Sequence, residues 1–283
     1  MKHYIIITNR PKDPELSVTG RVRAFLEKNG ASCSVYADEL ETEHWRQILK
    51  REGEQTDGIL VLGGDGTLLR AARDTADSAI PLLGVNLGTL GFLAEVETAG
   101  IEQALERLLR GDYQVEERMM LAGQVVRQGR VREEACSLND ITITRCGHLR
   151  MLYFQILVNG RLLKEYHADG IIVATPTGST GYNMSAGGPI VEPGARLIVL
   201  TPVCPHTLQT RSVILSAEDE IVIRITGKED REETGIEACF DGGRNLELAP
   251  GDEVRVTRSD RATSIIKLGE DSFLNVLHRK MSE

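Results

Sequence analysis

The fold of this chain is decided by one stretch, Ile59-Leu60-Val61-Leu62-Gly63-Gly64-Asp65-Gly66-Thr67-Leu68-Leu69. Its apolar run predicts a buried strand, and the glycines that follow predict a sharp turn into a helix beginning near Thr67. Such a turn brings bare backbone N–H groups up to an anion, and the helix adds the positive end of its dipole. The stretch therefore indicates a phosphate site.

Asp65 is the unusual residue in this turn. A carboxylate repels a phosphate unless it binds a metal or takes a proton from an attacking hydroxyl, so Asp65 suggests group-transfer chemistry. The structural alternative is an ordinary strand-to-helix turn in which Asp65 caps the helix. The turn alone leaves both interpretations open.

Composition narrows the class of protein. The chain has 283 residues, 41% of them hydrophobic, which suffices for one large domain or two ordinary ones. A formal net charge of −9 argues against nucleic acid or an anionic membrane as partner. The five scattered cysteines contain no CxxC pair, and no apolar run is long enough for a signal peptide or a membrane span. We expect a cytoplasmic protein with reduced thiols.

The first part of the chain alternates strands and helices. The expected strands cover residues 4–8, 32–36, 59–62 and 81–85. The expected helices run from an N-cap at Asp13 to Asn29-Gly30, through Trp45 and Leu49, from Leu68 to about Thr75, and from Ile101 to Leu109 with Gly111 closing the last. This alternation predicts an α/β domain, a parallel sheet with flanking helices, over residues 1–115.

A second glycine-rich turn follows the strand at 82–85. It reads Asn86-Leu87-Gly88-Thr89-Leu90-Gly91-Phe92-Leu93. Because ligands bind at the carboxyl ends of parallel strands, we expect the two turns to flank one crevice.

From Tyr113 onward the pattern becomes mostly β. The expected strands are 119–127, 141–145, 153–158, 170–174, 196–201 and 220–225. They predict a β-rich, sandwich-like domain over residues 116–265. We interpret the charged run 228–233 as a solvated hairpin tip, and residues 266–283 as a segment whose short helix packs back on the first domain.

The richest stretch lies at residues 169–189. It reads Asp169-Gly170-Ile171-Ile172-Val173-Ala174-Thr175-Pro176-Thr177-Gly178-Ser179-Thr180-Gly181-Tyr182-Asn183-Met184-Ser185-Ala186-Gly187-Gly188-Pro189. Its glycine N–H groups, hydroxyls and tyrosine ring suit phosphates, ribose hydroxyls and a base. The alternative is that Ser, Thr and Gly favour loops whatever the loop does.

The glycine turn 63–67, the turn 86–92, Asn139-Asp140 and the stretch 169–189 together closely resemble the ATP-dependent NAD kinase family, in the family's order and over most of the chain. The first turn alone also resembles lipid kinases and phosphofructokinases. Neither a Walker A motif nor GxGxxG is present. The resemblance implies an α/β N-terminal domain, a β-sandwich-like C-terminal domain, an active site between them, and a homodimer or homotetramer.

The resemblance also implies roles for individual residues. Asp65 would be the general base for the 2′-hydroxyl of the adenosine ribose, Asn139 and Asp140 would hold ribose and pyrophosphate, and Asp169 would orient the nicotinamide end. The implied NAD-binding residues are Asp65, Gly66, Asn139, Asp140, Arg150, His167, Asp169, Thr180, Gly181, Tyr182, Asn183, Met184 and Ser185. The implied ATP-side residues are Gly63, Gly64, Thr67, Arg70, Asn86 and Gly88. Without the resemblance, His167 would be a structural histidine and Arg150 a surface charge.

One position departs from the family pattern. Gly243, in Cys239-Phe240-Asp241-Gly242-Gly243-Arg244, stands where the family usually has glutamine or another polar side chain, which removes one peripheral contact.

The expected reaction is in-line transfer of the γ-phosphoryl of ATP to NAD, with Mg²⁺ carried by ATP rather than by protein ligands. A non-catalytic NAD(P)-sensing protein and a lipid kinase are the rival interpretations. The choice between NAD and NADH, between ATP and polyphosphate, and feedback by NADPH stay open.

Overall fold

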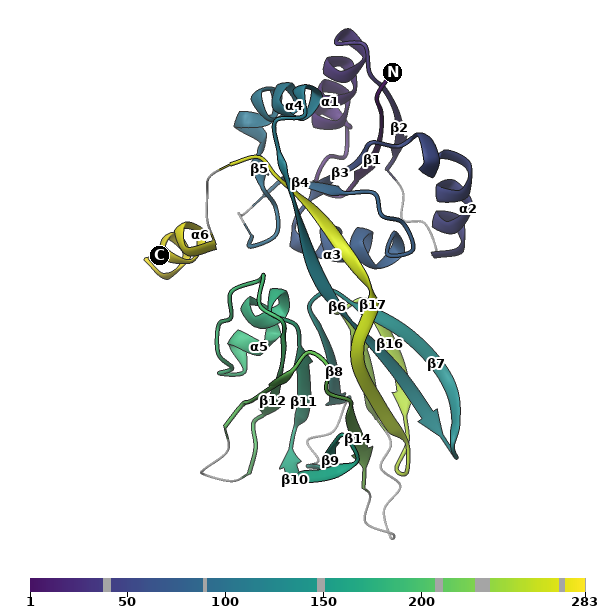
Figure 1. Ribbon diagram of the computed structural model, residues 1–283, viewed down its shortest axis with the longest axis vertical. Helices are drawn as coiled ribbons and strands as arrows, with labels where there is room; N and C mark the ends of the chain where they lie inside the picture. Colours follow the sequence, from purple (N-terminus) through teal and green to yellow (C-terminus); the bar gives the residue numbers. More distant parts are fainter. Residues whose placement is uncertain are drawn as a thin grey trace. The chain divides into compact units, whose positions relative to one another are not determined.

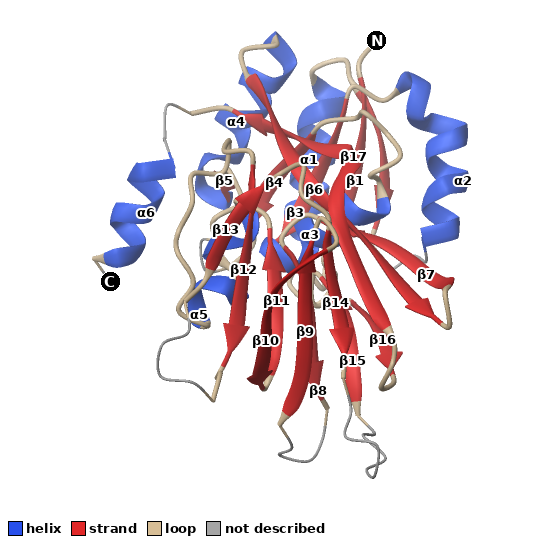
Figure 2. Cartoon of the chain, turned by 60° about the horizontal axis from the view of Figure 1, so that its bottom comes forward, coloured by secondary structure: helices blue, strands red, loops and turns tan. Residues whose placement is uncertain are grey.

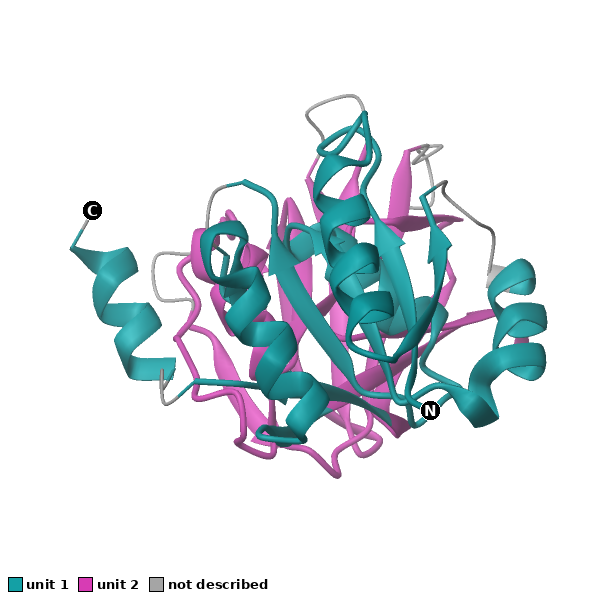
Figure 3. Cartoon of the chain, turned by 90° about the horizontal axis from the view of Figure 1, so that it is seen from above, with its two compact units in different colours: residues 1–118, 262–283 teal, residues 119–261 magenta. Residues whose placement is uncertain are grey.

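The computed structural model describes residues 1–37, 42–88, 91–146, 151–206, 211–226, 235–269 and 273–282. The chain forms two compact units, coloured separately in Figure 3. The first unit comprises residues 1–118 and 262–283, and the second comprises residues 119–261. The division into an α/β domain at 1–115, a β-rich domain at 116–265 and a C-terminal segment at 266–283 stays a prediction.

The first unit contains a parallel sheet, as the sequence predicts (Figure 1). Its strands are β1 (His3–Thr8), β2 (Ser32–Tyr36), β3 (Gly58–Gly63), β4 (Leu82–Asn86) and the short β5 (Val96–Glu97) beside β4. The end of β17 (Glu253–Lys267) pairs with β4 through Ile265 and Leu82. The strands lie in the order β2-β1-β3-β4, so the connection from β1 leads to one side of the sheet order and the connection from β3 leads to the other. Open parallel sheets bind ligands at such a switch point between two neighbouring strands.

Helices cover the sheet of the first unit. They are α1 (Ser17–Lys28), α2 (Thr42–Glu52), α3 (Asp65–Asp74) and α4 (Ile101–Arg110), with the 3₁₀ turns η1 (Gly53–Gln55) and η2 (Thr98–Gly100). Leu26 of α1 and Leu105 of α4 share one core cluster with Ile6 and Leu60 of the sheet. Each such buried side chain contributes about 1.5–3 kcal/mol, which fixes these helices on the sheet.

Two helices begin elsewhere than predicted. The first begins at Ser17 rather than directly after Asp13, because Leu16 takes a left-handed conformation with φ 55°. The Asp13 carboxylate still serves that helix from the loop, accepting the N–H groups of Thr19 at 2.9 Å and Val18 at 3.3 Å. The helix expected from Thr67 or Leu68 instead begins at Asp65, since Thr67 and Leu68 both donate their N–H groups back to Gly64 O.

The second unit contains a six-stranded antiparallel sheet and the antiparallel part of the 11-stranded sheet (Figure 2). One has the order β13-β12-β11-β8-β15-β16, from β8 (Asp140–Arg145), β11 (Gly170–Ala174), β12 (Leu197–Val203), β13 (Val213–Ser216), β15 (Ile236–Phe240) and β16 (Arg244–Leu248). The other includes β6 (Gln114–Arg127), β7 (Arg130–Ser137), β9 (Leu152–Val158), β10 (Arg161–Ala168), β14 (Ile221–Ile225) and the start of β17.

A single core joins these two sheets. Ile143 and Ile171 from one sheet share a buried cluster with Ile156 and Ile223 from the other. The predicted sandwich-like C-terminal domain is therefore confirmed.

The segment after β11 forms the 3₁₀ turn η3 (Thr177–Thr180) and the short α5 (Tyr182–Ser185). Ala186 and Val191, from this region, pack over Ile172 and Val199 on the sheet. At the C-terminus, α6 (Phe273–Met281) forms the predicted helix, but none of its described residues is buried. Its docking on the first domain stays a prediction, and the run 228–233 lies outside the described residues.

All five cysteines lie in the described part of the chain, and none forms a disulfide. No helix among the described residues has the length and hydrophobicity needed to cross a membrane.

Candidate active site

The glycine turn lies at the carboxyl end of β3, as predicted. Gly63 ends the strand, and a side chain there would collide with Thr67 one turn into α3. The Thr67 hydroxyl accepts a hydrogen bond from Asn9 Nδ2 at 2.9 Å, which ties the loop after β1 to this turn. Gly63 is therefore required for close packing, and Thr67 is a structural member of the turn.

The Asp65 carboxylate points to the second glycine turn. Its Oδ2 accepts the Phe92 N–H at 2.8 Å and its Oδ1 accepts the Leu93 N–H at 3.3 Å. A side chain at Gly91 would collide with this carboxylate. The helix-cap alternative for Asp65 is wrong, because Gly64 occupies the N-cap and Asp65 bonds to residues outside its own helix.

The two turns meet within the first unit. Leu87 N donates to Gly63 O at 2.7 Å. The buried Asn86 amide shapes the second turn, donating to Gly88 O at 2.6 Å and accepting the Gly88 N–H at 3.3 Å. Of the other ATP-side candidates, Gly88 is exposed and Arg70 on α3 is half-buried. Thr89 and Leu90 lie outside the described residues.

In the second unit, Asn139-Asp140 is held by a carboxylate that the sequence analysis did not assign. Asp241 accepts the N–H groups of Leu138 and Asn139 at 2.8 Å each and that of Asp140 at 3.2 Å. Asp241 sits in a tight turn with φ 50°, followed by Gly242 with φ 66°. The Asp241-Gly242 pair is a turn signal that can be read in the sequence. The sequence does not show that this turn binds the backbone of residues 138–140.

Asp140 itself is buried beside Asp241. Burial, and next the negative charge of Asp241, raise the pKa of Asp140 to about 7. The ordinary value is near 4, so the folded protein keeps this proton in a pH range where the unfolded chain has lost it.

This raised pKa makes stability depend on pH. Between about pH 4 and 7 the folded state binds one proton more than the unfolded state, so the free energy of unfolding falls as pH rises, by up to about 1.4 kcal/mol per pH unit. Asp140→Asn removes the group that titrates, so the free energy of unfolding of the variant no longer falls with pH on this account. We expect the Tm of the variant minus that of the wild type to increase between about pH 5 and pH 8, as measured by thermal unfolding.

The control for that measurement is Asp112→Asn. Hydrogen bonding to Arg107 lowers the pKa of Asp112, so this group is ionised in both states over the same range. A Tm difference for Asp140→Asn that stays flat or shrinks with rising pH would contradict the interpretation.

The loop after β11 brings Gly178 and Gly181 against Asn139-Asp140. Thr175 donates from Oγ1 to Leu138 O at 2.6 Å and from N to Asn139 O at 2.8 Å. A side chain at Gly178 would collide with the Asn139 backbone, whereas a Cβ at Gly181 would lie 3.2 Å from Asn139 Nδ2 and 3.7 Å from Asp140 Oδ2.

Asn139 also offers an open acceptor. Its Oδ1 is buried and has no hydrogen-bond partner among the described residues. A buried amide oxygen without a partner is costly unless a ligand supplies a donor, so this atom marks a candidate binding position.

The remaining predicted residues of this loop differ in exposure. Tyr182 and Met184 are 43% and 40% exposed, Ser185 is exposed, and the Thr180 hydroxyl donates to Thr177 O at 3.3 Å. Burial, then the charges of Cys204, Asp169 and Asp140, raise the pKa of Tyr182. The Tyr182 ring is therefore accessible, and the charges of Asp140 and Asp169 act on it.

Asn183 is the one buried residue among the predicted NAD-binding residues of this loop. It is fully buried, its Nδ2 donates to Ser179 O at 3.1 Å and Pro189 O at 3.0 Å, and its Oδ1 accepts the Thr201 hydroxyl at 2.7 Å. Its amide therefore supports the loop from inside the unit. The assignment of Asn183 to NAD binding stays a prediction.

Asp169 is paired with Arg145, which the sequence analysis treated only as the end of a strand. Arg145 Nη2 donates to Asp169 Oδ2 at 2.9 Å. His167 is exposed on β10 and packs edge-on against Tyr153, with ring centroids 4.5 Å apart. Arg150 lies outside the described residues.

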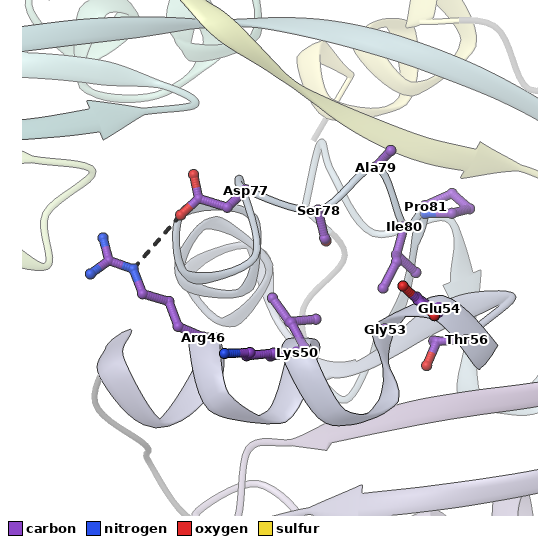
Figure 4. Close-up of a pocket in the computed structure, with 11 residues that line it drawn as sticks. Arg46, Lys50, Gly53, Glu54, Thr56, Asp77, Ser78, Ala79, Ile80 and Pro81 are labelled. Atoms are coloured by element: carbon purple, nitrogen blue, oxygen red, sulfur yellow. Dashed lines mark ion pairs between the residues drawn. The ribbon is translucent and has the colours of Figure 1, made fainter.

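A cavity of about 570 Å³ also lies in the first unit, away from these turns (Figure 4). It is lined by α2 and the segment before β4, and an ion pair of 3.7 Å joins Arg46 to Asp77 at its rim. It lies toward the amino ends of β3 and β4, and none of the predicted site residues lines it.

Both halves of the chain match models of one family. Residues 5–113 match the ATP-NAD kinase N-terminal domain, and residues 138–268 match the ATP-NAD kinase C-terminal domain. The chain belongs to the ATP-NAD kinase family. An NAD kinase of Lachnospira eligens is 41% identical to it over 295 residues, covering 99% of this chain and 100% of the relative. One of Agathobacter rectalis is 44% identical over 282 residues, covering 99% of each.

Two solved structures share the fold of this ATP-NAD kinase family member. Yeast NADH kinase complexed with NADH superposes with a TM-score of 0.85 at 23% identity, covering 100% of this chain and 88% of the other. An NAD kinase from Archaeoglobus fulgidus in complex with ATP gives a TM-score of 0.80 at 22% identity, covering 99% of each chain. The expected two-domain fold is confirmed.

Proposed function

We propose that this protein transfers the γ-phosphoryl of ATP to the 2′-hydroxyl of the adenosine ribose of NAD, giving NADP and ADP. Membership in the family and relatives named NAD kinase at about 40% identity support a phosphotransferase of this kind. The observation that carries the mechanism is the Asp65 carboxylate, which backbone N–H groups of the second turn hold at the carboxyl end of β3. Asp65 would accept the hydroxyl proton as the phosphoryl group transfers.

The second unit would bind NAD. The unpartnered Asn139 Oδ1 and the Asp140 carboxyl are the groups we assign to the ribose and pyrophosphate region. The exposed ring of Tyr182 would pack against the adenine, and Asp169 would orient the nicotinamide end. Arg145 would keep the Asp169 carboxylate in position.

A divalent cation would accompany ATP. Among the described residues no three His, Cys, Asp or Glu side chains come together in a way that could hold a metal ion. We assign the cation, Mg²⁺ in our proposal, to the phosphate oxygens of ATP, as is usual in phosphoryl transfer. When bound, it would neutralise charge on the transferring phosphoryl group.

Two other functions remain as rivals for the test. An NAD(P)-sensing protein would keep the binding residues without turnover, and a lipid kinase would share only the first glycine turn. The homo-oligomeric state and the cytoplasmic location stay predictions.

The decisive experiment is NADP formation by the purified chain with NAD, ATP and Mg²⁺, beside a reaction without ATP. NADP that forms only with ATP supports the proposal. Tight NAD binding without NADP would favour the sensor, and phosphorylation of a lipid instead of NAD would favour the lipid kinase.

A further inference from the structure

A lysine that the sequence analysis passed over lies against both glycine turns. Lys12 belongs to the loop between β1 and α1. A Cβ built at Gly64 would lie 2.7 Å from Lys12 Nζ, and one built at Gly88 would lie 3.5 Å from it. The ammonium group therefore lies beside two glycines of the predicted ATP side.

The backbone of Lys12 is fixed on both sides. Its N–H donates to Asn9 O at 2.9 Å, and Asn9 is bonded to Thr67 in the glycine turn. The next residue, Asp13, is buried and bonded to Thr19. Only the four-carbon side chain remains free to move, so less entropy is lost when an anion fixes the ammonium group.

Lys12 also lies at the place in the sheet where a ligand is expected. The loop after β1 and the loop after β3 leave the sheet at the point where the strand order reverses. In open parallel sheets this point is the crevice in which ligands bind, and Lys12 and Gly64 are on the two loops that border it.

The ammonium group has no counter-ion among the residues that the structure describes. Lys12 makes no ion pair or side-chain hydrogen bond with any residue in the described ranges, although the chain as a whole carries an excess of acidic groups. A compact cation beside bare backbone N–H groups repels them and attracts a polyanion. In phosphoryl transfer such a lysine neutralises phosphate charge.

We propose that Lys12 binds the triphosphate of ATP, so that it is a substrate-binding residue of the first unit. This inference rests on the proposed NAD kinase function. It assigns the lysine to ATP rather than to NAD, because its two glycine neighbours, Gly64 and Gly88, are among the residues assigned to the ATP side.

The test compares Lys12→Ala with Lys28→Ala. Lys28 is an exposed lysine at the far end of α1, so its variant loses the same charge away from the turns. We expect Lys12→Ala to raise the KM for ATP about tenfold or more, as for the loss of a charge-assisted contact, with the KM for NAD nearly unchanged. Lys28→Ala should leave both constants unchanged.

A second variant tests the contact itself. The φ of −127° at Gly64 suits alanine, and the closest atom to the added methyl is the Lys12 ammonium. We expect Gly64→Ala to weaken ATP binding in the wild type and to have a much smaller further effect in Lys12→Ala, as a double-mutant cycle detects. Additive effects would overturn the assignment of this contact.

Binding of a non-hydrolysable ATP analogue, measured by calorimetry, separates this inference from the proposed function. If the wild type binds the analogue but forms no NADP, the proposed function fails while the affinity of Lys12→Ala still decides the role of Lys12. An unchanged affinity for the analogue, or an equal loss of affinity for NAD in a variant with wild-type Tm, would overturn the inference.

Discussion

Asp65→Asn should lower kcat by about 10²–10⁴-fold while the KM for NAD changes little. The amide cannot accept the hydroxyl proton, but it nearly matches the carboxylate in size. One oxygen remains to accept the Phe92 N–H at the position of the 2.8 Å bond. The other bond, to Leu93 at 3.3 Å, is replaced by two donors that face each other, which costs about 1–3 kcal/mol of stability.

Steady-state kinetics, NAD binding and Tm together check this expectation. A variant that binds NAD, stays folded and loses turnover would assign the proton transfer to Asp65. Activity within about threefold of the wild type would remove Asp65 from the catalytic role.

Gly91→Ala should reproduce much of the Asp65 defect without touching Asp65. The added methyl group would collide with the Asp65 carboxylate, which is the mobile end of a side chain and can swing aside. The backbone therefore keeps its course, but the carboxylate leaves the N–H groups of Phe92 and Leu93. We expect kcat to fall by about 10²-fold or more, since misplacing a reacting group by about 1 Å costs this much.

Gly20→Ala is the matched control. Gly20 lies in α1, and a Cβ there meets no atom within 4 Å. This variant should keep wild-type kcat and gain slightly in stability, because alanine favours the helix by about 1 kcal/mol over glycine. Wild-type kcat in Gly91→Ala as well would contradict the view that the second turn holds Asp65 in place.

Local features of the sequence predicted much of the first unit. The alternation of apolar strands and helices predicted the parallel sheet, and Gly30 and Gly111, both with positive φ, end helices where expected. These features depend on periodicity and on backbone conformations that glycine adopts most easily, so neighbouring residues suffice to predict them.

The edge strand β10 of the second unit was missed for a physical reason. β10 lies at the end of its sheet, and residues 161–165 are all exposed, so the strand lacks an alternating apolar pattern. It forms because the turn Asn159-Gly160, with φ values of 49° and 74°, returns the chain alongside β9. The strand after this turn has no apolar pattern of its own from which it could be predicted.

By itself, the sequence determined the two glycine clusters, the order of the elements in the first unit and the identity of the candidate base, because each depends on residues close together in the chain. Only the tertiary structure decided what holds them. The partner of Asp65 at Phe92 is 27 residues away, and Asp241 holds Asp140 across 101 residues. Lys12 meets Gly64 only because β1 and β3 are neighbours in the sheet. Such contacts arise from strand pairing and core packing, which bring distant segments together and leave no local pattern to read.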